Sequence, residues 1–316
     1  MSVVTRDDVV VAAARIAEAV ERTSLIEARI NGHTVWLKCE NRQTGGAFKL
    51  RGASNRLLAM SAAERARGVV AFSSGNHAQG VAIAARRLGM KAVIVMPRDA
   101  PSLKVEGTRA EGAEIVFYDR RSEDRIAIAN AIAADRGATL VPSFDDPFIV
   151  AGQGSVGIEI LDQLGRSPSR IVIPCGGGGL AAGIALACPE AAITIVEPHG
   201  WDDMGRSLRG GAIVPVEPDA PPTLCDALQT PRVSPITFDL LGERQTEALS
   251  VSDEDASAAV AWAWREHQLV VEAGGAVALA AVLAGMVGLV DDLVVIVSGG
   301  NIDPALHARI VAQATR

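Results

Sequence analysis

Aromatic side chains are scarce in this chain of 316 residues, since Phe, Trp and Tyr together make up 3% of it. Single-stranded nucleic acid is held largely by bases stacked on aromatic rings, so this scarcity argues against such a partner. Positive charge is also lacking, because the net charge is −7 and a general binder of phosphate backbones would be basic. We expect no nucleic-acid partner. A small anionic ligand would have to bind to backbone amides and helix ends.

Cysteine and long hydrophobic runs are also rare. The four cysteines are scattered along the chain, at Cys39, Cys175, Cys188 and Cys225. They form no CxxC pair, so neither a zinc knuckle nor a disulfide framework is expected, and the pattern favours a reducing, cytoplasmic location. The longest uncharged run, residues 273–290, is interrupted by glycine and falls short of the about 20 apolar residues of a membrane span. Residues 1–8 contain no apolar core of a signal peptide, and we expect no membrane association.

The length and the pattern of the chain predict an α/β protein with two lobes, because 316 residues are many for one compact core. Short apolar strands alternate with helical segments from about residue 53 to residue 144, which predicts a parallel sheet of about four strands. We expect residues 53–144 to form a small domain, and residues 1–52 with 145–316 to form a large one. Residues 198–235 are rich in proline and are predicted to form a long loop.

A run of glycines follows a predicted buried strand at residues 171–174 and precedes a predicted helix. Such a turn points backbone N–H groups at a phosphate, and glycine lets the backbone come close. The amides predicted to hold a phosphate are those of Gly176, Gly177, Gly178, Gly179 and Leu180. The kind of phosphate stays open, because residues 176–181 also fit the pattern G-x-G-x-x-A, with Glu197 about 20 residues on. A dinucleotide-binding module is therefore an alternative.

Three other stretches contain residues that suit a ligand-binding site. Between a predicted strand and a helix lies a turn whose amides and hydroxyls suit a carboxylate, although a simple helix cap would explain it too. This turn consists of Ser73, Ser74, Gly75, Asn76 and His77. Ser298 ends the last predicted strand, where a parallel sheet binds ligands, and its hydroxyl suits a ring nitrogen. Lys49 follows a Gly pair, and a lysine in apolar surroundings can act as an amine nucleophile.

These motifs, in this order, resemble the fold-type-II pyridoxal phosphate enzymes, most closely the serine/threonine dehydratase and serine racemase family. The resemblance spans nearly the whole chain. It rests on TGGAFKLRGA (44–53), SSGNHAQG (73–80), VAGQG (150–154), the glycine run and SGGN (298–301). It implies a fold like that of tryptophan synthase β, with two open parallel-sheet lobes and pyridoxal phosphate (PLP) in the cleft between them. A dinucleotide fold explains neither Lys49 nor Ser298, so the resemblance favours the PLP site.

The resemblance implies a role for each residue of the cofactor site. Lys49 would form the internal Schiff base with PLP, Phe48 would pack beside the ring and Asn76 would bond the 3′-oxygen. The amides of residues 176–180 would cradle the phosphate. Ser298 would meet the pyridine nitrogen with a hydroxyl, which leaves the ring weakly protonated and suits loss of a β-leaving group.

The implied reaction is that of an ammonia-lyase. The substrate carboxylate would bind at residues 73–77, Lys49 would remove the α-proton, and the β-hydroxyl would leave, yielding a 2-oxo acid and ammonia. L-serine, L-threonine, 3-hydroxyaspartate or a hydroxyectoine-derived amino acid would all fit. Ser74 stands where the racemase-like branches have serine, and it would face the α-carbon opposite Lys49, so a serine racemase is the alternative. A homodimer is expected.

A divalent-cation site is the last feature that the resemblance implies. The segment from Glu197 to Asp203 is similar to the cation loop of this family. Its ligands would be the carboxylates of Glu197 and Asp203 with the backbone carbonyl of Trp201, which suit a hard ion such as Mg²⁺. Solvated loop acids and a helix cap would explain the same residues.

Overall fold

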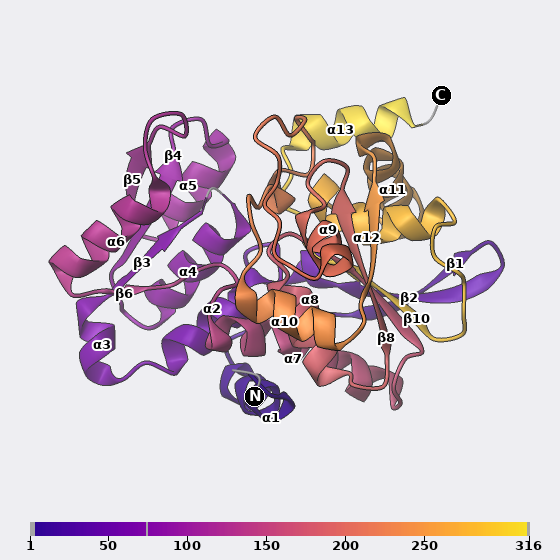
Figure 1. Cartoon of the computed structure of the whole chain (residues 1–316), viewed down its shortest axis with the longest axis horizontal. Coiled ribbons are helices and arrows are strands. Elements are labelled where there is room, and N and C mark those ends of the chain that lie inside the picture. The colour runs from indigo at the N-terminus through magenta and orange to yellow at the C-terminus, as the bar shows by residue number, and fades with distance from the viewer. Residues whose placement is uncertain (1–3, 74, 315–316) are drawn as a thin grey trace.

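The computed structural model describes residues 4–73 and 75–314, which fold around two sheets that lie side by side (Figure 1). The smaller sheet has the strand order β5-β4-β3-β6, and every neighbouring pair is parallel. Its strands are β3 (Val69–Phe72), β4 (Ala92–Pro97), β5 (Glu114–Tyr118) and β6 (Thr139–Leu140). The helices α3 (Ala62–Arg67), α4 (Asn76–Arg87), α5 (Ser102–Ala110) and α6 (Arg125–Arg136) accompany them. The predicted parallel sheet of four strands is confirmed.

The larger sheet has the order β1-β2-β10-β7-β8-β9. Its strands are β1 (Leu25–Ile30), β2 (His33–Cys39), β7 (Arg170–Pro174), β8 (Ala192–Pro198), β9 (Glu247–Val251) and β10 (Leu293–Val297). The neighbours from β2 to β9 are parallel, whereas β1 pairs antiparallel with β2. The turn between them, Asn31-Gly32, has φ values of 50° and 84°, as a tight hairpin requires. This hairpin adds an antiparallel edge to an otherwise parallel sheet.

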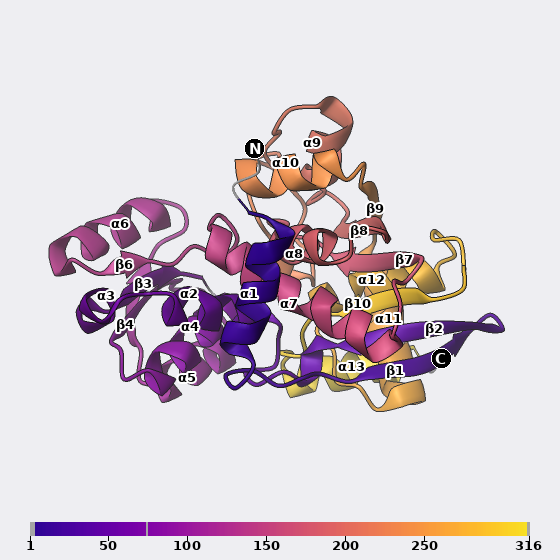
Figure 2. The ribbon, with the colours of Figure 1, turned by 90° about the horizontal axis from the view of Figure 1, so that it is seen from below.

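Central strands of the larger sheet are apolar on both faces because helices cover both. Val295 and Val297 of β10 pack in one core cluster with α12 (Ala273–Leu283) and α11 (Asp253–His267). Val294 and Ile296 point the other way, into the cluster formed with α8 (Gly179–Ala187) and α1 (Arg6–Ile16). Figure 2 shows α1 lying across α7 (Pro147–Leu164) and α8 on that face. Such burial on both faces is typical of parallel sheets.

Helix α2 (Lys49–Leu58) joins the two sheets, since it packs against both α7 and α4. It follows β2 through the short η1 turn (Glu40–Arg42). The helices α2 and α7 touch at glycines, because a Cβ added to Gly152 would lie 2.7 Å from the Cα of Gly52. This close approach holds the start of α2, and with it Lys49, at a fixed place between the sheets.

The proline-rich segment is more regular than predicted. Residues 198–235 contain α9 (Asp203–Gly210) and the 3-10 turn η2 (Asp226–Leu228), and α10 (Pro235–Glu243) starts at their end. Helix α9 forms because Met204, Gly205 and Ser207 are buried on one face, a tertiary contact that proline content does not reveal. The expectation of one continuous loop is therefore wrong for this part.

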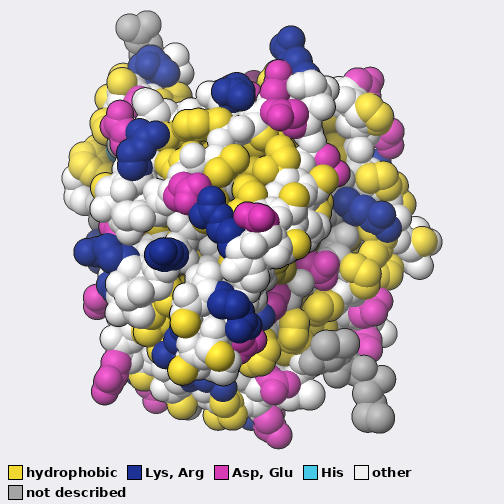
Figure 3. Space-filling model, turned by 90° about the vertical axis from the view of Figure 1, so that its left-hand side faces the viewer, with side chains coloured by type: hydrophobic (Ala, Val, Ile, Leu, Met, Phe, Trp, Pro, Cys, Tyr) yellow, Lys and Arg dark blue, Asp and Glu magenta, His cyan; other side chains and the backbone are white. Residues whose placement is uncertain are grey.

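One outer face of the molecule is mixed in charge. The face on the side of the smaller sheet shows basic, acidic and apolar side chains interspersed (Figure 3). Within residues 4–73 and 75–314, no helix combines the length and the apolar character that crossing a bilayer requires. α13 (Pro304–Gln313) closes the described chain beside α11 (Figure 1).

Candidate active site

A cavity of about 980 Å³ is lined by residues from both sheets. Phe72, Tyr118 and Leu140 end the strands β3, β5 and β6, and they line it from the smaller sheet. Pro174, at the end of β7, and Ser298, directly after β10, line it from the larger sheet. The carboxyl ends of parallel strands are where ligands of open α/β sheets bind. Both sheets thus present this edge to one cavity.

Lys49 is the first residue of α2, and its side chain lines the cavity. Its Nζ donates a hydrogen bond to the carbonyl of Ser143 at 3.2 Å and lies 5.0 Å from the centre of the Phe48 ring. Burial lowers the pKa of Lys49 to about 8, so a sizeable fraction of the amine is neutral near neutral pH. The Phe48 N–H donates to the carbonyl of Ser298 at 3.2 Å, which brings Lys49 and the end of β10 together.

Arg51, two residues after Lys49, is fully buried in a network of charges behind the cavity. Its guanidinium donates to Oε2 of Glu40 at 2.7 Å and to Oε1 of Glu159 at 2.6 Å. Glu159 also accepts a hydrogen bond of 2.6 Å from Nζ of Lys38. An uncompensated charge is very costly in a protein interior, so each member holds the others in place. The network ties α2 to β2 and α7, and thereby positions Lys49.

The glycine run lines the cavity at the start of α8, as predicted. Gly178 caps that helix with φ of 85°, a left-handed conformation that glycine adopts without strain. A Cβ on Gly177 would lie 2.2 Å from Cδ1 of Phe144, and one on Gly178 would lie 2.6 Å from Cε of Met204. The first N–H groups of a helix have no partner within it and favour an anion. The glycines thus let this loop pack tightly at the cavity wall, which Leu180 also lines, and the start of α8 offers backbone N–H groups to a phosphate.

The predicted carboxylate turn lies in the same cavity, which Ser73, Gly75, Asn76 and His77 line. Ser74 lies outside the described residues. The Gly75 N–H donates to Oγ of Ser73 at 3.2 Å, a local bond that shapes the turn before α4.

His77 is buried, and its ring lies against the end of β6. Burial, together with the charge of Lys49, lowers the pKa of His77 to about 3, so the ring is neutral. Nε2 lies 2.9 Å from the carbonyl of Val141, and only a protonated Nε2 can donate to it. The other ring nitrogen, Nδ1, has no hydrogen-bond partner among the described groups. His77 thus presents an acceptor rather than a positive charge.

The predicted site residues do not include Glu272, Lys104 or Asp226, which also line the cavity. Glu272 accepts a hydrogen bond of 2.5 Å from Nδ2 of Asn76, and burial raises the pKa of its carboxyl to about 7. Lys104, on α5, forms an ion pair with Asp226 of η2. These two residues are 122 positions apart in sequence. Helix α5 accompanies the smaller sheet and η2 lies between two strands of the larger one, so no local pattern could reveal the pair.

Predicted cation ligands lie apart from the cavity, at the end of β8. Glu197 accepts hydrogen bonds from the N–H groups of Met204 at 3.0 Å and Gly205 at 2.8 Å. Asp203 is buried, and neither carboxylate oxygen has a hydrogen bond of acceptable geometry within the described chain. Burial raises the pKa of Glu197 to about 8 and that of Asp203 to about 7. Across residues 4–73 and 75–314, no cluster of three or more His, Cys, Asp or Glu side chains with metal-binding geometry occurs.

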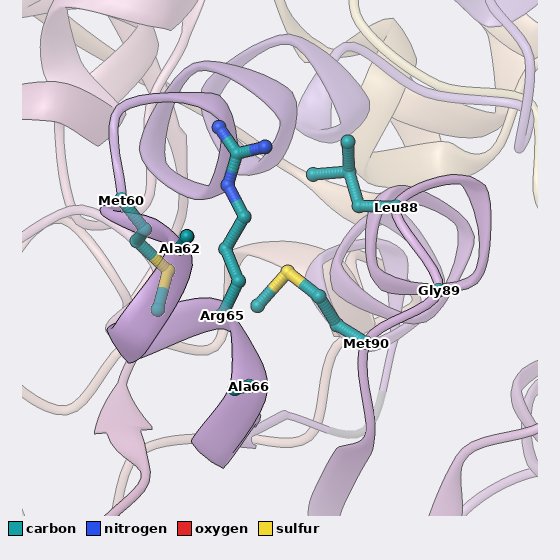
Figure 4. A pocket seen from close by; sticks show the side chains of 7 residues that line it. All are labelled: Met60, Ala62, Arg65, Ala66, Leu88, Gly89 and Met90. Atoms are coloured by element: carbon teal, nitrogen blue, oxygen red, sulfur yellow. The ribbon is translucent and has the colours of Figure 1, made fainter.

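A second hollow, of about 440 Å³, shares no residue with the cavity (Figure 4). It is lined by Met60, Ala62, Arg65, Ala66, Leu88, Gly89 and Met90. In Figure 4, Arg65 lies between Met60 and Leu88, and its Nη2 donates to the carbonyl of Leu58 at 2.6 Å. None of the predicted site residues lies there, so the larger cavity is the candidate active site.

Comparison with known proteins places this site in a family. The model of the family described as pyridoxal-phosphate dependent enzyme matches residues 16–299. The chain therefore belongs to the pyridoxal-phosphate dependent enzymes, with the fold-type-II architecture that its motifs predict. The alternative of a dinucleotide-binding module is not supported.

Several relatives match over nearly the full chain. The L-threo-3-hydroxyaspartate ammonia-lyase of a Pseudomonas species is 41% identical over 96% of this chain and 97% of its own. The L-threonine ammonia-lyase of Thermotoga maritima is 37% identical over 98% of this chain and 78% of its own. Among solved structures, maize serine racemase aligns with a TM-score of 0.90 and 32% identity, covering 99% of this chain and 98% of that one.

Proposed function

We propose that this chain is a PLP-dependent ammonia-lyase that eliminates water from a β-hydroxy amino acid and releases a 2-oxo acid and ammonia. L-serine, L-threonine and 3-hydroxyaspartate are the candidate substrates. The observation that supports this most is the meeting, in one cavity, of a lysine with a lowered pKa and a glycine cradle. When bound, PLP supplies an aldehyde for the substrate amine and a ring that accepts electron density from the α-carbon.

The residues of the cavity have distinct tasks in this proposal. The amides of residues 176–180 hold the phosphate, Ser298 meets the ring nitrogen, and Asn76 bonds the 3′-oxygen beside Phe48. Nζ of Lys49 takes the proton from the α-carbon, because its lowered pKa leaves it a base near neutral pH. The electron pair left at the α-carbon expels the β-hydroxyl, which departs with a proton as water.

The substrate carboxylate is bound at the turn that opens α4, by Ser73, Ser74, Gly75, Asn76 and His77. Helix N-termini favour anions, and because burial lowers the pKa of His77 and keeps its ring neutral, the N–H groups of the turn attract the carboxylate. We assign residues 53–144 to a small domain, because all four strands of the smaller sheet lie within these bounds. Residues 1–52 and 145–316 then form the large, PLP-binding domain.

A divalent cation such as Mg²⁺ is proposed at Glu197, Asp203 and the carbonyl of Trp201. The buried carboxylate of Asp203 supports it, because backbone groups of Asp203 and Val233 and the charge of Arg206 compensate it only in part, and burial still raises its pKa. Oxygen ligands of this kind suit a hard cation. Because the two carboxylates do not line the cavity, the ion would stabilise the fold rather than touch the substrate.

Serine racemisation is a second candidate function. It is favoured by the close structural likeness to maize serine racemase and by the serine at position 74. In this proposal Ser74 acts as a second catalytic residue, opposite Lys49. The substitution Ser74→Ala should abolish racemisation and spare elimination from the L-substrate. Undetectable racemisation of L-serine by the unmodified enzyme would exclude this function.

We also propose a cytoplasmic homodimer. All four cysteines are buried free thiols, as a reducing compartment allows. The exposed Val10 and Val11 on α1 leave apolar side chains that a second copy would cover. Sedimentation of the purified enzyme at two concentrations would show the assembly state.

A substrate screen tests the proposed function. The purified, PLP-loaded protein is incubated with L-serine, L-threonine, L-threo-3-hydroxyaspartate and their D-forms, and 2-oxo acid and ammonia are both quantified. We expect equal amounts of both products from at least one substrate, and none with Lys49→Ala. Release of neither product from any of these compounds would overturn the proposal.

A further inference from the structure

Lys104 is a buried cation in the wall of the cavity. Only 5% of the residue is exposed, although it extends from α5 into the site. A Cβ added to Gly75 would lie 3.6 Å from Nζ of Lys104, so the ammonium lies beside the turn that opens α4. This is the turn at which the proposed function places the substrate carboxylate. Lys104 is therefore within reach of groups attached to that carboxylate.

The ion pair of Lys104 with Asp226 is asymmetric. The Lys104 side chain is 6% exposed, whereas that of Asp226 is 45% exposed and belongs to the short turn η2. Water can solvate Asp226 at little cost when it leaves, but Lys104 is held in the protein and needs an anion beside it. Lys104 is thus placed like a cation that binds an anionic ligand, with Asp226 as a counter-ion that the ligand can replace.

Other cations at the cavity wall are placed differently. Arg120 is exposed and pairs with Asp99, whereas the guanidinium of Arg125 lies 5.6 Å from the centre of the Phe72 ring. Arg232 is exposed as well. Apart from Lys49, whose amine the proposed function assigns to the cofactor, Lys104 is the buried cation among the lysines and arginines that the structure describes at this wall. Its charge is less screened by solvent than those of Arg120 and Arg232.

The side chain of a neutral substrate offers no anion to this cation. The side chains of serine and threonine offer a hydroxyl and at most a methyl group, and neither replaces the charge of Asp226. In a four-carbon dicarboxylic amino acid, the α-carbon and the β-carbon separate the second carboxylate from the first. When the first is bound at the turn, the second can reach Nζ of Lys104 and make a charge-assisted hydrogen bond.

We propose that Lys104 determines substrate specificity: its ammonium binds the side-chain carboxylate of an acidic β-hydroxy amino acid, in exchange for Asp226. This inference rests on the proposed elimination function and narrows its substrate class. Asp226 acts as the resting counter-ion, which keeps Lys104 paired while the cavity holds no acidic substrate. No bond is made or broken in this exchange apart from hydrogen bonds.

The test compares acidic with neutral amino acids in the PLP-loaded enzyme and in its Lys104→Met, Lys104→Arg and Asp226→Asn variants. We expect Lys104→Met to lower the ratio of kcat/KM for L-threo-3-hydroxyaspartate to that for L-serine by about thirtyfold or more, mainly through KM. Lys104→Arg should restore much of the ratio, because it keeps the charge. Asp226→Asn should raise the ratio, since it removes the competing carboxylate.

Binding of L-aspartate and L-alanine, which lack the β-hydroxyl, gives a readout independent of elimination. Titrated by the change in cofactor absorbance, Lys104→Met should weaken aspartate at least about tenfold more than alanine. Equal loss for both amino acids, or no loss for either, would overturn the inference and leave Lys104–Asp226 a structural pair. If the unmodified enzyme eliminates water from neither substrate, the proposed function fails, but this comparison still decides the role of Lys104.

Discussion

Asn76 donates a hydrogen bond of 2.5 Å to Oε1 of Glu272, across 196 residues of sequence. Asn76 opens α4 beside the smaller sheet, and Glu272 precedes α12 beside the larger one. Asn301 in turn donates to Oδ1 of Asn76 at 2.8 Å. These bonds join the two sheets at the wall of the cavity. They also orient the amide that we propose to meet PLP.

Glu272→Gln should change how stability depends on pH. Burial raises the pKa of Glu272 from 4.5 to about 7, so the native state binds this proton more tightly than the unfolded state. The stability that the protonated carboxyl of Glu272 contributes is fully present below the pKa of the unfolded state, and it is lost as the pH rises through about 7. Glutamine cannot ionise. The free energy of unfolding of the apo-variant, relative to that of the unmodified apoenzyme, should therefore be about 1–3 kcal/mol higher at pH 8 than at pH 5. A stability difference that is the same at every pH would contradict this.

Gly178→Ala should weaken PLP binding at least about tenfold, because the added Cβ strains the left-handed backbone and displaces the loop from Met204. Gly165→Ala is the matched control. Gly165 has φ of 68° but no atom within 4 Å of the added Cβ, so it suffers the backbone strain alone. Titration of both apo-variants with PLP measures the difference. Equal affinities in the two variants would refute a phosphate site at the glycine run.

Arg51→Met should destabilise the protein by about 3–5 kcal/mol, since it leaves the buried Glu40 and Glu159 without their partner. Arg22 offers a control, because its pair with Asp162 is exposed, at 56% and 65%. Arg22→Met should cost less than about 1 kcal/mol. Urea unfolding of both variants measures these costs. If Arg51→Met cost no more than Arg22→Met, the network would not hold α2 in place.

Asp203→Asn should remove the response of the enzyme to Mg²⁺. A cation that binds the native state raises the melting temperature by mass action, and a chelator reverses the effect. We expect this rise in the unmodified enzyme and in Asp162→Asn, whose exposed carboxylate pairs with Arg22 and is not among the proposed ligands. The melting temperature of Asp203→Asn should not change with Mg²⁺ or chelator. An undiminished response in Asp203→Asn would exclude the proposed site.

Local patterns in the sequence were enough to predict the strands of the smaller sheet, because each apolar run is bounded by a glycine or proline. For the cap of α1 they favour Thr5 or Asp7, and for the cap of α11 Ser252 with Asp253; the structure has Thr5 and Ser252. The same patterns predict Ser122 as the cap of α6, but the cap is Asp124, whose side chain accepts from the N–H groups of Ile126 and Ala127. The strand β1 was missed, although Asn31-Gly32 is a hairpin signal that predicts it.

Site residues divide in the same way. Lys49, Ser298 and the glycine run stand in short motifs, and the resemblance of these motifs to the fold-type-II PLP enzymes predicts that they meet. Lys104 and Asp226 meet only through the packing of α5 against a loop of the larger sheet, so neither is marked by its neighbours in sequence. Burial sets the pKa of Glu272, and burial is a property of the whole fold.

The central claim is that Lys49 is the amine to which PLP is attached. The PLP-loaded enzyme is reduced with borohydride, digested, and mapped by mass spectrometry. We predict that the protein is yellow before reduction and that PLP is then fixed to Nζ of Lys49, with no such label in Lys49→Ala. A colourless protein that binds NAD instead, or a label on any other lysine, would contradict the account.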